Sequence, residues 1–298
     1  MRVFLGFIAL LAIPTVIVGF GLRQKGLNEK FAAINHPMNQ KEFYYVAHQA
    51  GSAERPGNTW EAIQNARRES WQVLIWLDVQ QTKDGQLVLF GDDMLESQTE
   101  GKGHIGFHNW DEIKDLDAGF QYREGDNYPY RGTGIKLRKL EDTLMQFPLY
   151  EFILNIKANN KNIDLEVTAM IEKLGASDRI ILTSPFEFVL MALRKQKPLW
   201  MFGIGHAEFT RLSMFASVGL EPLMPLKGDI LIPQKLLQKQ ILDENLIHEL
   251  QRRKKRILTW VDNENDWEHW RKFQVDGLIT NKPTAFIRLL NPQFDIDQ

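Results

Sequence analysis

Four polar side chains, His48, Asp78, Asp92 and Lys157, stand at or just after the end of a short apolar run of the sequence. Histidine transfers protons near neutral pH, carboxylates hold hard divalent cations, and lysine balances anionic charge. These residue types could together bind a phosphate ester and act on it. Each also has a purely structural interpretation, because a histidine at a strand end can be a hydrogen-bonding group and Asp92-Asp93 can form a turn or a helix cap.

The elements that position these side chains alternate between strands and helices. Apolar runs predict strands at 44–47, 73–79, 87–90, 152–157, 179–183, 199–204, 257–261 and 277–279. Helical spacing predicts helices at 59–69, 140–147, 165–174, 186–195, 243–253 and 267–273. The dipeptide Asp84-Gly85 predicts a hairpin turn between two of the strands.

Strand–helix units repeated over about 250 residues favour an α/β fold, the (β/α)8 TIM barrel, over an open doubly wound sheet. No G-x-G-x-x-G follows the first strand, which argues against a dinucleotide-binding fold. Segment 94–135 is too long for an ordinary connection and is predicted to be an insertion after the third strand. The barrel domain is predicted at 43–292. In such a barrel the strand-end side chains should converge at one face.

The motifs at these strand ends, taken in order, resemble those of the glycerophosphodiester phosphodiesterase family. That family reads roughly A-H-R-G, E-N-T, E-L-D-V, T-K-D-G, V-F-H-D-D and I-E-I-K. The matching text here is Ala47-His48-Gln49-Ala50-Gly51, Asn58-Thr59, Trp76-Leu77-Asp78-Val79, Thr82-Lys83-Asp84-Gly85, Leu89-Phe90-Gly91-Asp92-Asp93 and Leu154-Asn155-Ile156-Lys157. Segments 258–263 and 275–283 extend the resemblance, which covers about residues 44–290 and implies a barrel whose insertion closes over the active-site end.

The resemblance implies a site where carboxylates hold Mg²⁺ or Ca²⁺, two histidines move protons and an arginine clamps the phosphate. Carried over by position, it makes His48 catalytic and Asp78 a weak metal ligand. The remaining positions carried over are Asn155 beside that ligand, and Gln49, Asn58 and Lys157 as substrate- or phosphate-binding residues. Trp260 is also expected to bind substrate, because it stands near a strand end and could line a pocket. Several family positions are substituted: Gln49 and Ser97 replace arginines, Gly57, Trp76 and Asn155 replace glutamates, and Gly91 replaces the second histidine.

With three metal carboxylates reduced to one, we expect the family's Mg²⁺ or Ca²⁺ not to bind. The sequence therefore predicts a family member that has lost most or all metal-dependent hydrolysis and that binds a phosphodiester, a lipid head group or a protein partner. The alternative is a divergent, active phosphodiesterase acting on glycerophosphodiesters or lysophospholipids in lipid metabolism. That alternative needs a substitute histidine, His104 or His108, and a displaced carboxylate, Glu54 or Asp92.

The N-terminal segment 3–22 contains no charged residue. A helix of about 20 apolar residues spans a bilayer core, so residues 1–22 are predicted to be a transmembrane anchor, with a cleavable signal peptide as the competing interpretation. Residues 23–42 are polar and mixed, as in a stalk or linker. Basic residues flank the segment on both sides, so charge does not orient it. The resemblance favours a single-pass membrane protein with an extracytoplasmic domain.

The overall charge excludes a field-driven partnership with nucleic acid, since the net charge of the 298 residues is −2. The absence of cysteine excludes disulfides, thiolate metal sites and a cysteine nucleophile. One basic run, Arg252–Arg256, is predicted to end a helix and complement its dipole, with contact to an anionic membrane surface as the alternative.

Overall fold

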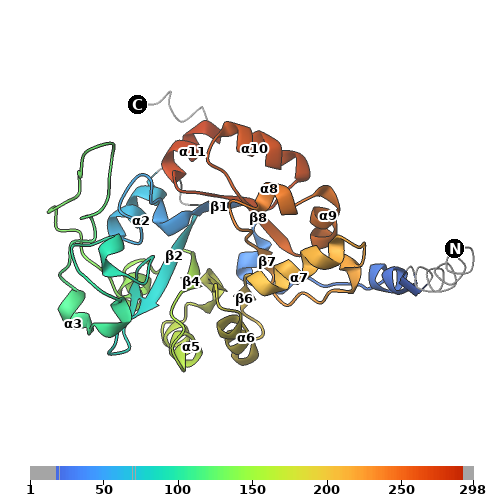
Figure 1. Cartoon of the computed structure of the whole chain (residues 1–298), viewed down its shortest axis with the longest axis horizontal. Helices are drawn as coiled ribbons and strands as arrows, with labels where there is room; N and C mark the ends of the chain where they lie inside the picture. Colours follow the sequence, from blue (N-terminus) through green and yellow to red (C-terminus); the bar gives the residue numbers. More distant parts are fainter. Residues whose placement is uncertain (1–17, 20, 69, 71, 291–298) are drawn as a thin grey trace, which may run out of the picture.

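Eight short parallel strands form a nearly closed barrel in the computed structural model, which describes residues 18–19, 21–68, 70 and 72–290 (Figure 1). Their order around the barrel is β6-β5-β4-β2-β1-β9-β8-β7. A parallel bridge between Gly203 and Ile230 joins the two ends of this order. The predicted parallel barrel is confirmed and is consistent with a TIM barrel. The strands are β1 (Tyr44–Ala47), β2 (Val73–Gln81), β4 (Phe152–Ile156), β5 (Ile180–Thr183), β6 (Met201–Phe202), β7 (Ile230–Leu231), β8 (Arg256–Trp260) and β9 (Gly277–Thr280).

Helices surround the barrel on its outside (Figure 1). They are α2 (Trp60–Arg67), α4 (Leu140–Gln146), α5 (Ile163–Lys173), α6 (Glu187–Gln196), α7 (His206–Ala216), α8 (Gln238–Ile241), α9 (Glu244–Arg252), α10 (Glu264–Trp270) and α11 (Pro283–Leu290). Local sequence sets their ends: α2 begins where the Thr59 side chain accepts a hydrogen bond from the amide of Ala62. Asp243 caps α9 in the same way through the amide of Leu246.

Alternation along each strand decides which side chains enter the barrel. In β2, Leu74 and Trp76 belong to the cluster inside the barrel, whereas Ile75 and Leu77 pack in the cluster that faces the helices. Because side chains of a strand alternate between faces, Asp78 lies on the same inner face as Trp76. The sequence W-L-D therefore delivers an indole and a carboxylate to the barrel interior.

The third strand of the chain, β3 (Leu87–Leu89), pairs antiparallel with β2 and is not part of the barrel wall. The predicted hairpin turn is confirmed, with Gly85 at φ +82°. The segment that follows, which includes α3 (Trp110–Ile113), packs on a small apolar cluster of its own that contains Phe90, Leu95 and Ile105. The insertion thus follows the second barrel strand and the hairpin strand appended to it.

One barrel strand and four helices were not predicted, the helices being α3, α7, α8 and α11. The eighth wall position is taken by β7, only two residues long, rather than by the predicted strand at 87–90. Helix α7 spans His206–Ala216, a segment to which the sequence assigned no element. The apolar run at β7 covers only 230–232, whereas β6, which is equally short, lies within the longer run 199–204 that predicted it.

The predicted anchor falls largely on residues 1–17 and 20, which lie outside the described residues. Among the residues that the structure describes, no helix combines the length and the apolar character that crossing a membrane requires. Segment 23–42 packs against the barrel rather than standing clear of it as a stalk. Arg23 donates to the carbonyl of Gly219 at 2.8 Å, and Met38 is buried, accepting a 2.6 Å hydrogen bond from Tyr44 through its carbonyl.

The basic run after α9 serves mainly internal contacts. Arg253 is 2% exposed and donates to Glu249 and to the carbonyls of Met224 and Glu221. Arg256 pairs with Asp276 at 2.7 Å. Arg252 ends α9 as predicted and bonds Glu249 together with the carbonyls of Leu27 and Glu29 in the N-terminal segment. The run therefore ties the N-terminal segment to the barrel.

Candidate active site

The predicted site residues converge at the carboxyl ends of neighbouring strands. His48 follows β1, and Asp78 on β2 is in register with Asn155 on β4. Lys157 comes directly after β4, and Trp260 ends β8 on the other side of β1 and β9. The barrel order β4-β2-β1-β9-β8 thus brings together residues that are up to 212 positions apart, from 48 to 260.

Asp78 is the centre of the site and its carboxylate is enclosed by nitrogen donors. The carboxylate is 1% exposed. Its Oδ1 accepts from Trp76 Nε1 at 3.1 Å and from Asn155 Nδ2 at 2.7 Å. Its Oδ2 accepts from Gln49 Nε2 at 2.8 Å and lies 3.3 Å from Lys157 Nζ. Both carboxylate oxygens are therefore satisfied by the protein itself, three times by neutral N–H groups and once by an ammonium group.

Asn58 supports this carboxylate from the backbone side. Its Oδ1 accepts from the amide of Asp78 at 2.9 Å, and the side chain is 3% exposed. Asn58 and Gln49 have left-handed backbones, with φ of 58° and 50°. Such conformations cost about 1–3 kcal/mol each in a residue other than glycine and cluster at functional sites. Asn58, predicted to bind substrate, is thus a buried support of Asp78.

Gly91 makes room for the Gln49 side chain. A Cβ atom at Gly91 would lie 2.7 Å from Gln49 Nε2 and 3.5 Å from Asp78 Oδ2. The family's second histidine would stand at this position. The glutamine amide thus lies where any side chain at 91 would have to begin, and the two substitutions are sterically linked. The carbonyl of Gly91 in turn accepts a hydrogen bond from Lys157.

His48 is oriented by a residue that the sequence reading did not single out. Its Nδ1 lies 2.8 Å from Asn281 Oδ1, just after β9. An amide oxygen only accepts, so Nδ1 is the donor and Nε2 of the neutral ring is left as an acceptor. The ring packs edge-on against Trp76 and Trp260, with centroids 5.3 and 4.8 Å away. Burial lowers the pKa of His48, which favours the neutral ring.

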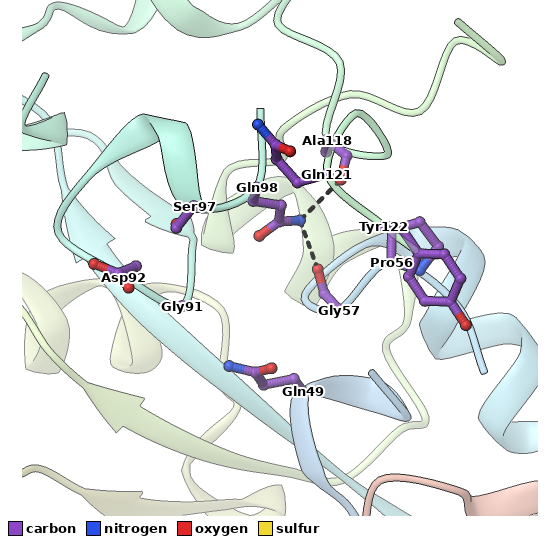
Figure 2. Close-up of a pocket in the computed structure, with 10 residues that line it drawn as sticks. All are labelled: Gln49, Pro56, Gly57, Gly91, Asp92, Ser97, Gln98, Ala118, Gln121 and Tyr122. Atoms are coloured by element: carbon purple, nitrogen blue, oxygen red, sulfur yellow. Dashed lines mark hydrogen bonds between the residues drawn. The ribbon is translucent and has the colours of Figure 1, made fainter. Parts of the chain in front are cut away.

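Two cavities open beside Asp78. One, of about 270 Å³, lies between the strand ends and the insertion and is lined by uncharged polar groups of Gln49, Ser97, Gln98 and Gln121 and by the Asp92 carboxylate (Figure 2). The other, of about 310 Å³, is lined by Trp76, Asn155, Trp260 and Lys235 among others. We call the second one the mouth cavity. Gln49 and Trp76, which line different cavities, both bond the same carboxylate.

Gln98 holds the insertion over the first cavity. Its Nε2 donates to the carbonyl of Gly57 at 2.8 Å and to that of Ala118 at 3.2 Å, as the dashed lines in Figure 2 show. This residue was not predicted, because nothing in its local sequence signals a contact 41 residues away. Asn281 could have been noticed, since it stands in the motif at 275–283 that carried the resemblance.

Three of the four residues that could have replaced the lost groups form contacts away from Asp78, whereas Asp92 lines the first cavity. His104 accepts from the amide of Gly106, and His108 bonds the carbonyl of Lys102, so both rings bond within the insertion. Glu54 accepts from the amides of Thr284 and Ala285 and thereby caps α11. A fourth candidate, Asp92, turns its Oδ1 toward the amide of Asp93 at 2.6 Å.

The donor set does not fit a divalent cation. Mg²⁺ and Ca²⁺ require several oxygen ligands, preferably carboxylates. Within the described residues no group of three or more His, Cys, Asp or Glu side chains is arranged to hold a metal ion. Around Asp78 the neighbouring atoms are N–H groups and an ammonium group, which repel a cation. Asn155, which the sequence placed beside Asp78 in a weak metal site, directs its Nδ2 to the Asp78 carboxylate.

Comparison with known proteins places the whole barrel in one family. The model of the glycerophosphoryl diester phosphodiesterase family matches residues 48–285. The chain is 27% identical over 257 residues to the glycerophosphodiester phosphodiesterase of Caldanaerobacter subterraneus subsp. tengcongensis, covering 82% of this chain and 96% of that protein. It is 23% identical over 277 residues to lysophospholipase D GDPD3 of Homo sapiens, covering 82% of this chain and 84% of that protein.

Solved structures share the fold. The glycerophosphoryl diester phosphodiesterase domain of an uncharacterised Mycobacterium tuberculosis protein has a TM-score of 0.70 at 19% identity, covering 84% of this chain and all (100%) of that one. A phosphodiesterase from Oleispira antarctica, solved with the product sn-glycerol-3-phosphate, has a TM-score of 0.64 at 19% identity, covering 86% of this chain and 97% of that one.

Proposed function

Because this chain belongs to the glycerophosphoryl diester phosphodiesterase family, we propose that it binds the head group of a phosphodiester at the barrel mouth without hydrolysing it by a metal-dependent route. The observation that carries this proposal is the saturation of Asp78. A divalent ion would have to displace Lys157 and the N–H donors of Gln49, Trp76 and Asn155 before it reached a carboxylate oxygen. It would then find a single formal negative ligand.

The polar character of the mouth supports retained binding. Lys235 lies in the mouth cavity, 5.7 Å above the Trp260 ring, and offers a cation to a phosphate group, although Asp262 competes for it at 2.6 Å. Trp76 and Trp260, which pack on the His48 ring, both line the mouth cavity and give it an aromatic surface. Aromatic surfaces of this kind bind quaternary ammonium groups such as choline.

A second function, hydrolysis of glycerophosphodiesters or lysophospholipids, is favoured by the relatives. Those compared above are named as a glycerophosphodiester phosphodiesterase and a lysophospholipase D. His48 is present and is held in one tautomer by Asn281, as a proton-transferring residue requires. Hydrolysis in this chain would have to proceed without the family's full set of metal-binding carboxylates, because Trp76 and Asn155 stand where the family has glutamates.

Measurements of ligand binding and of ligand hydrolysis distinguish the two proposed functions. Purified full-length chain should bind glycerophosphocholine in isothermal titration calorimetry with the same affinity in EDTA and in Ca²⁺ or Mg²⁺, and ³¹P NMR should show no product. Trp260→Phe should weaken binding because Trp260 lines the mouth cavity, whereas Trp267→Phe, outside the lining, should not. Metal-dependent turnover that His48→Ala abolishes would instead establish the enzyme.

We also propose that the segment 3–22 anchors the chain in a membrane as a single pass, with the barrel on the extracytoplasmic side. The support is its length without any charged residue. Carbonate extraction of membranes tests the anchor, and protease accessibility in intact cells tests the side. Release of the chain by carbonate would contradict an integral anchor.

A further inference from the structure

The mouth cavity shares part of its wall with an apolar groove on the outside of the barrel. This groove, of about 510 Å³, runs along α7 and faces the loop after β7 and helix α8. We call it the α7–α8 groove. Four residues line both spaces: His206, Phe209, Pro233 and Gln234. The groove therefore lies directly beside the candidate site.

The groove offers an apolar lining although several serine and threonine side chains face it. Thr210 Oγ1, Ser213 Oγ and Ser217 Oγ each donate to a carbonyl of α7 itself, at 2.9, 3.0 and 2.8 Å. Their hydroxyl hydrogens are thus already used. The remaining lining includes the apolar side chains of Met214 and Leu237. A hydrocarbon chain could occupy this groove without leaving a buried donor unsatisfied.

The far end of the groove lies beside the N-terminal segment. Ser217 lines the groove, and Gly219, two residues on, accepts the hydrogen bond from Arg23. Figure 1 shows the described N-terminal helical residues next to the end of α7. Met214 and Val218 at this end are 66% and 68% exposed. The end of the groove away from the mouth cavity is thus an exposed apolar edge that lies beside Arg23.

Hydrogen bonds from Trp260 fix the wall of the α7–α8 groove relative to the mouth cavity. Its Nε1 donates to the carbonyl of Pro233 at 2.8 Å, and its backbone amide and carbonyl exchange hydrogen bonds with the Gln238 side chain at 2.7 and 2.9 Å. Pro233 and Gln238 both line the groove. A ligand that spans both spaces would therefore meet a wall held in one position relative to the mouth.

We propose that the α7–α8 groove binds the single acyl chain of a lysophospholipid whose head group lies in the mouth cavity. This rests on the proposed binding of a phosphodiester head group and names the ligand class as a single-chain lipid. A partner protein could cover the groove from outside, but it would not fill the mouth cavity that lies beside the groove. The occupant that matches both ends is an amphiphile with one polar and one apolar part.

A chain-length series tests the groove. Lysophosphatidylcholines of increasing chain length, below their micelle concentrations and in EDTA, should bind the full-length chain about fourfold more tightly per buried methylene. Met214→Asp and Ser213→Trp should flatten this dependence and leave the affinity for glycerophosphocholine unchanged. Met191→Asp is the matched control, because Met191 is an exposed methionine of the neighbouring helix α6 that does not line the groove.

The outcomes separate the groove from the head-group site. An affinity independent of chain length, whether because the groove is unused or because the N-terminal segment fills it, would overturn the groove proposal. The same flattening in Met191→Asp would also overturn it. If glycerophosphocholine fails to bind while the chain-length dependence and its loss in Met214→Asp remain, the groove proposal holds and the head-group proposal fails.

Discussion

Replacing Lys157 by methionine removes the ammonium group that faces the buried Asp78 carboxylate. The Nζ atom lies 3.3 Å from Oδ2, the carboxylate is 1% exposed, and Lys157 itself is 29% exposed. At an effective dielectric constant of about 20, two charges at this distance attract each other by about 5 kcal/mol. Solvent reaches the lysine and screens part of this attraction, and three N–H donors remain on the carboxylate. We therefore expect Lys157→Met to lower the free energy of unfolding by about 3 kcal/mol.

Lys173→Met provides the matched control. Its ammonium group lies closer to its partner, 2.6 Å from Glu141 Oε1, but the two side chains are 70% and 36% exposed. Exposed pairs contribute about 0–1 kcal/mol. The comparison sets a longer but buried ion pair against a shorter but exposed one. We expect the buried pair, Lys157 with Asp78, to contribute more to the free energy of unfolding.

Urea unfolding of the full-length chain in mild detergent measures the difference, provided that tryptophan fluorescence and circular dichroism give coincident transitions. The double variant Lys157→Met with Asp78→Asn should lose less stability than the sum of the single losses, because it removes the buried charge together with its cation. A loss below about 1 kcal/mol in Lys157→Met, comparable with an exposed pair, would refute the interpretation of Lys157 as the counter-ion of Asp78.

Three further predictions concern the same site. Gly91→Ala should lower the free energy of unfolding by about 1–3 kcal/mol, because the new Cβ displaces the Gln49 amide from the buried Asp78 carboxylate. In urea unfolding of a Gln49→Ala variant, the same Gly91→Ala change should lower the free energy of unfolding by clearly less. Burial lowers the pKa of His48 below its value in the unfolded chain. The stabilising contribution of the neutral ring is therefore fully present above the unfolded pKa, and the free energy of unfolding falls as the pH drops through about 6.5. His48→Gln should weaken this pH dependence, and a His48 ring that titrates above about 6.5 in NMR would contradict the prediction. Trp76→Glu combined with Asn155→Glu should produce a Ca²⁺-dependent rise in melting temperature that the unmodified chain lacks, and equal responses in the two proteins would show that carboxylate number is not what limits metal binding.

The sequence predicted the barrel because its signals are local. Apolar runs, the Asp84-Gly85 turn and the polar residue that ends each strand all act within a few positions, and the structure confirms the parallel barrel and the hairpin. The substitutions at Gln49, Trp76 and Gly91 were also readable, since each stands inside a recognisable motif. The sequence did not predict β7, because its apolar run covers only 230–232, although the equally short β6 was found within the longer run 199–204.

The sequence by itself thus determined that the strand ends carry one metal-type carboxylate, one histidine and one lysine, and that most family carboxylates are absent. Only the tertiary structure decided what happens to that carboxylate. Trp76 reaches Asp78 from its own strand, whereas Gln49, just after β1, and Asn155, on β4, reach it from 29 and 77 residues away. Those contacts exist because barrel closure sets the spacing of the strand ends, and a hydrogen bond formed only below about 3.2 Å cannot be inferred from residue order. The same closure, through the bridge between Gly203 and Ile230, places the α7–α8 groove beside the mouth cavity.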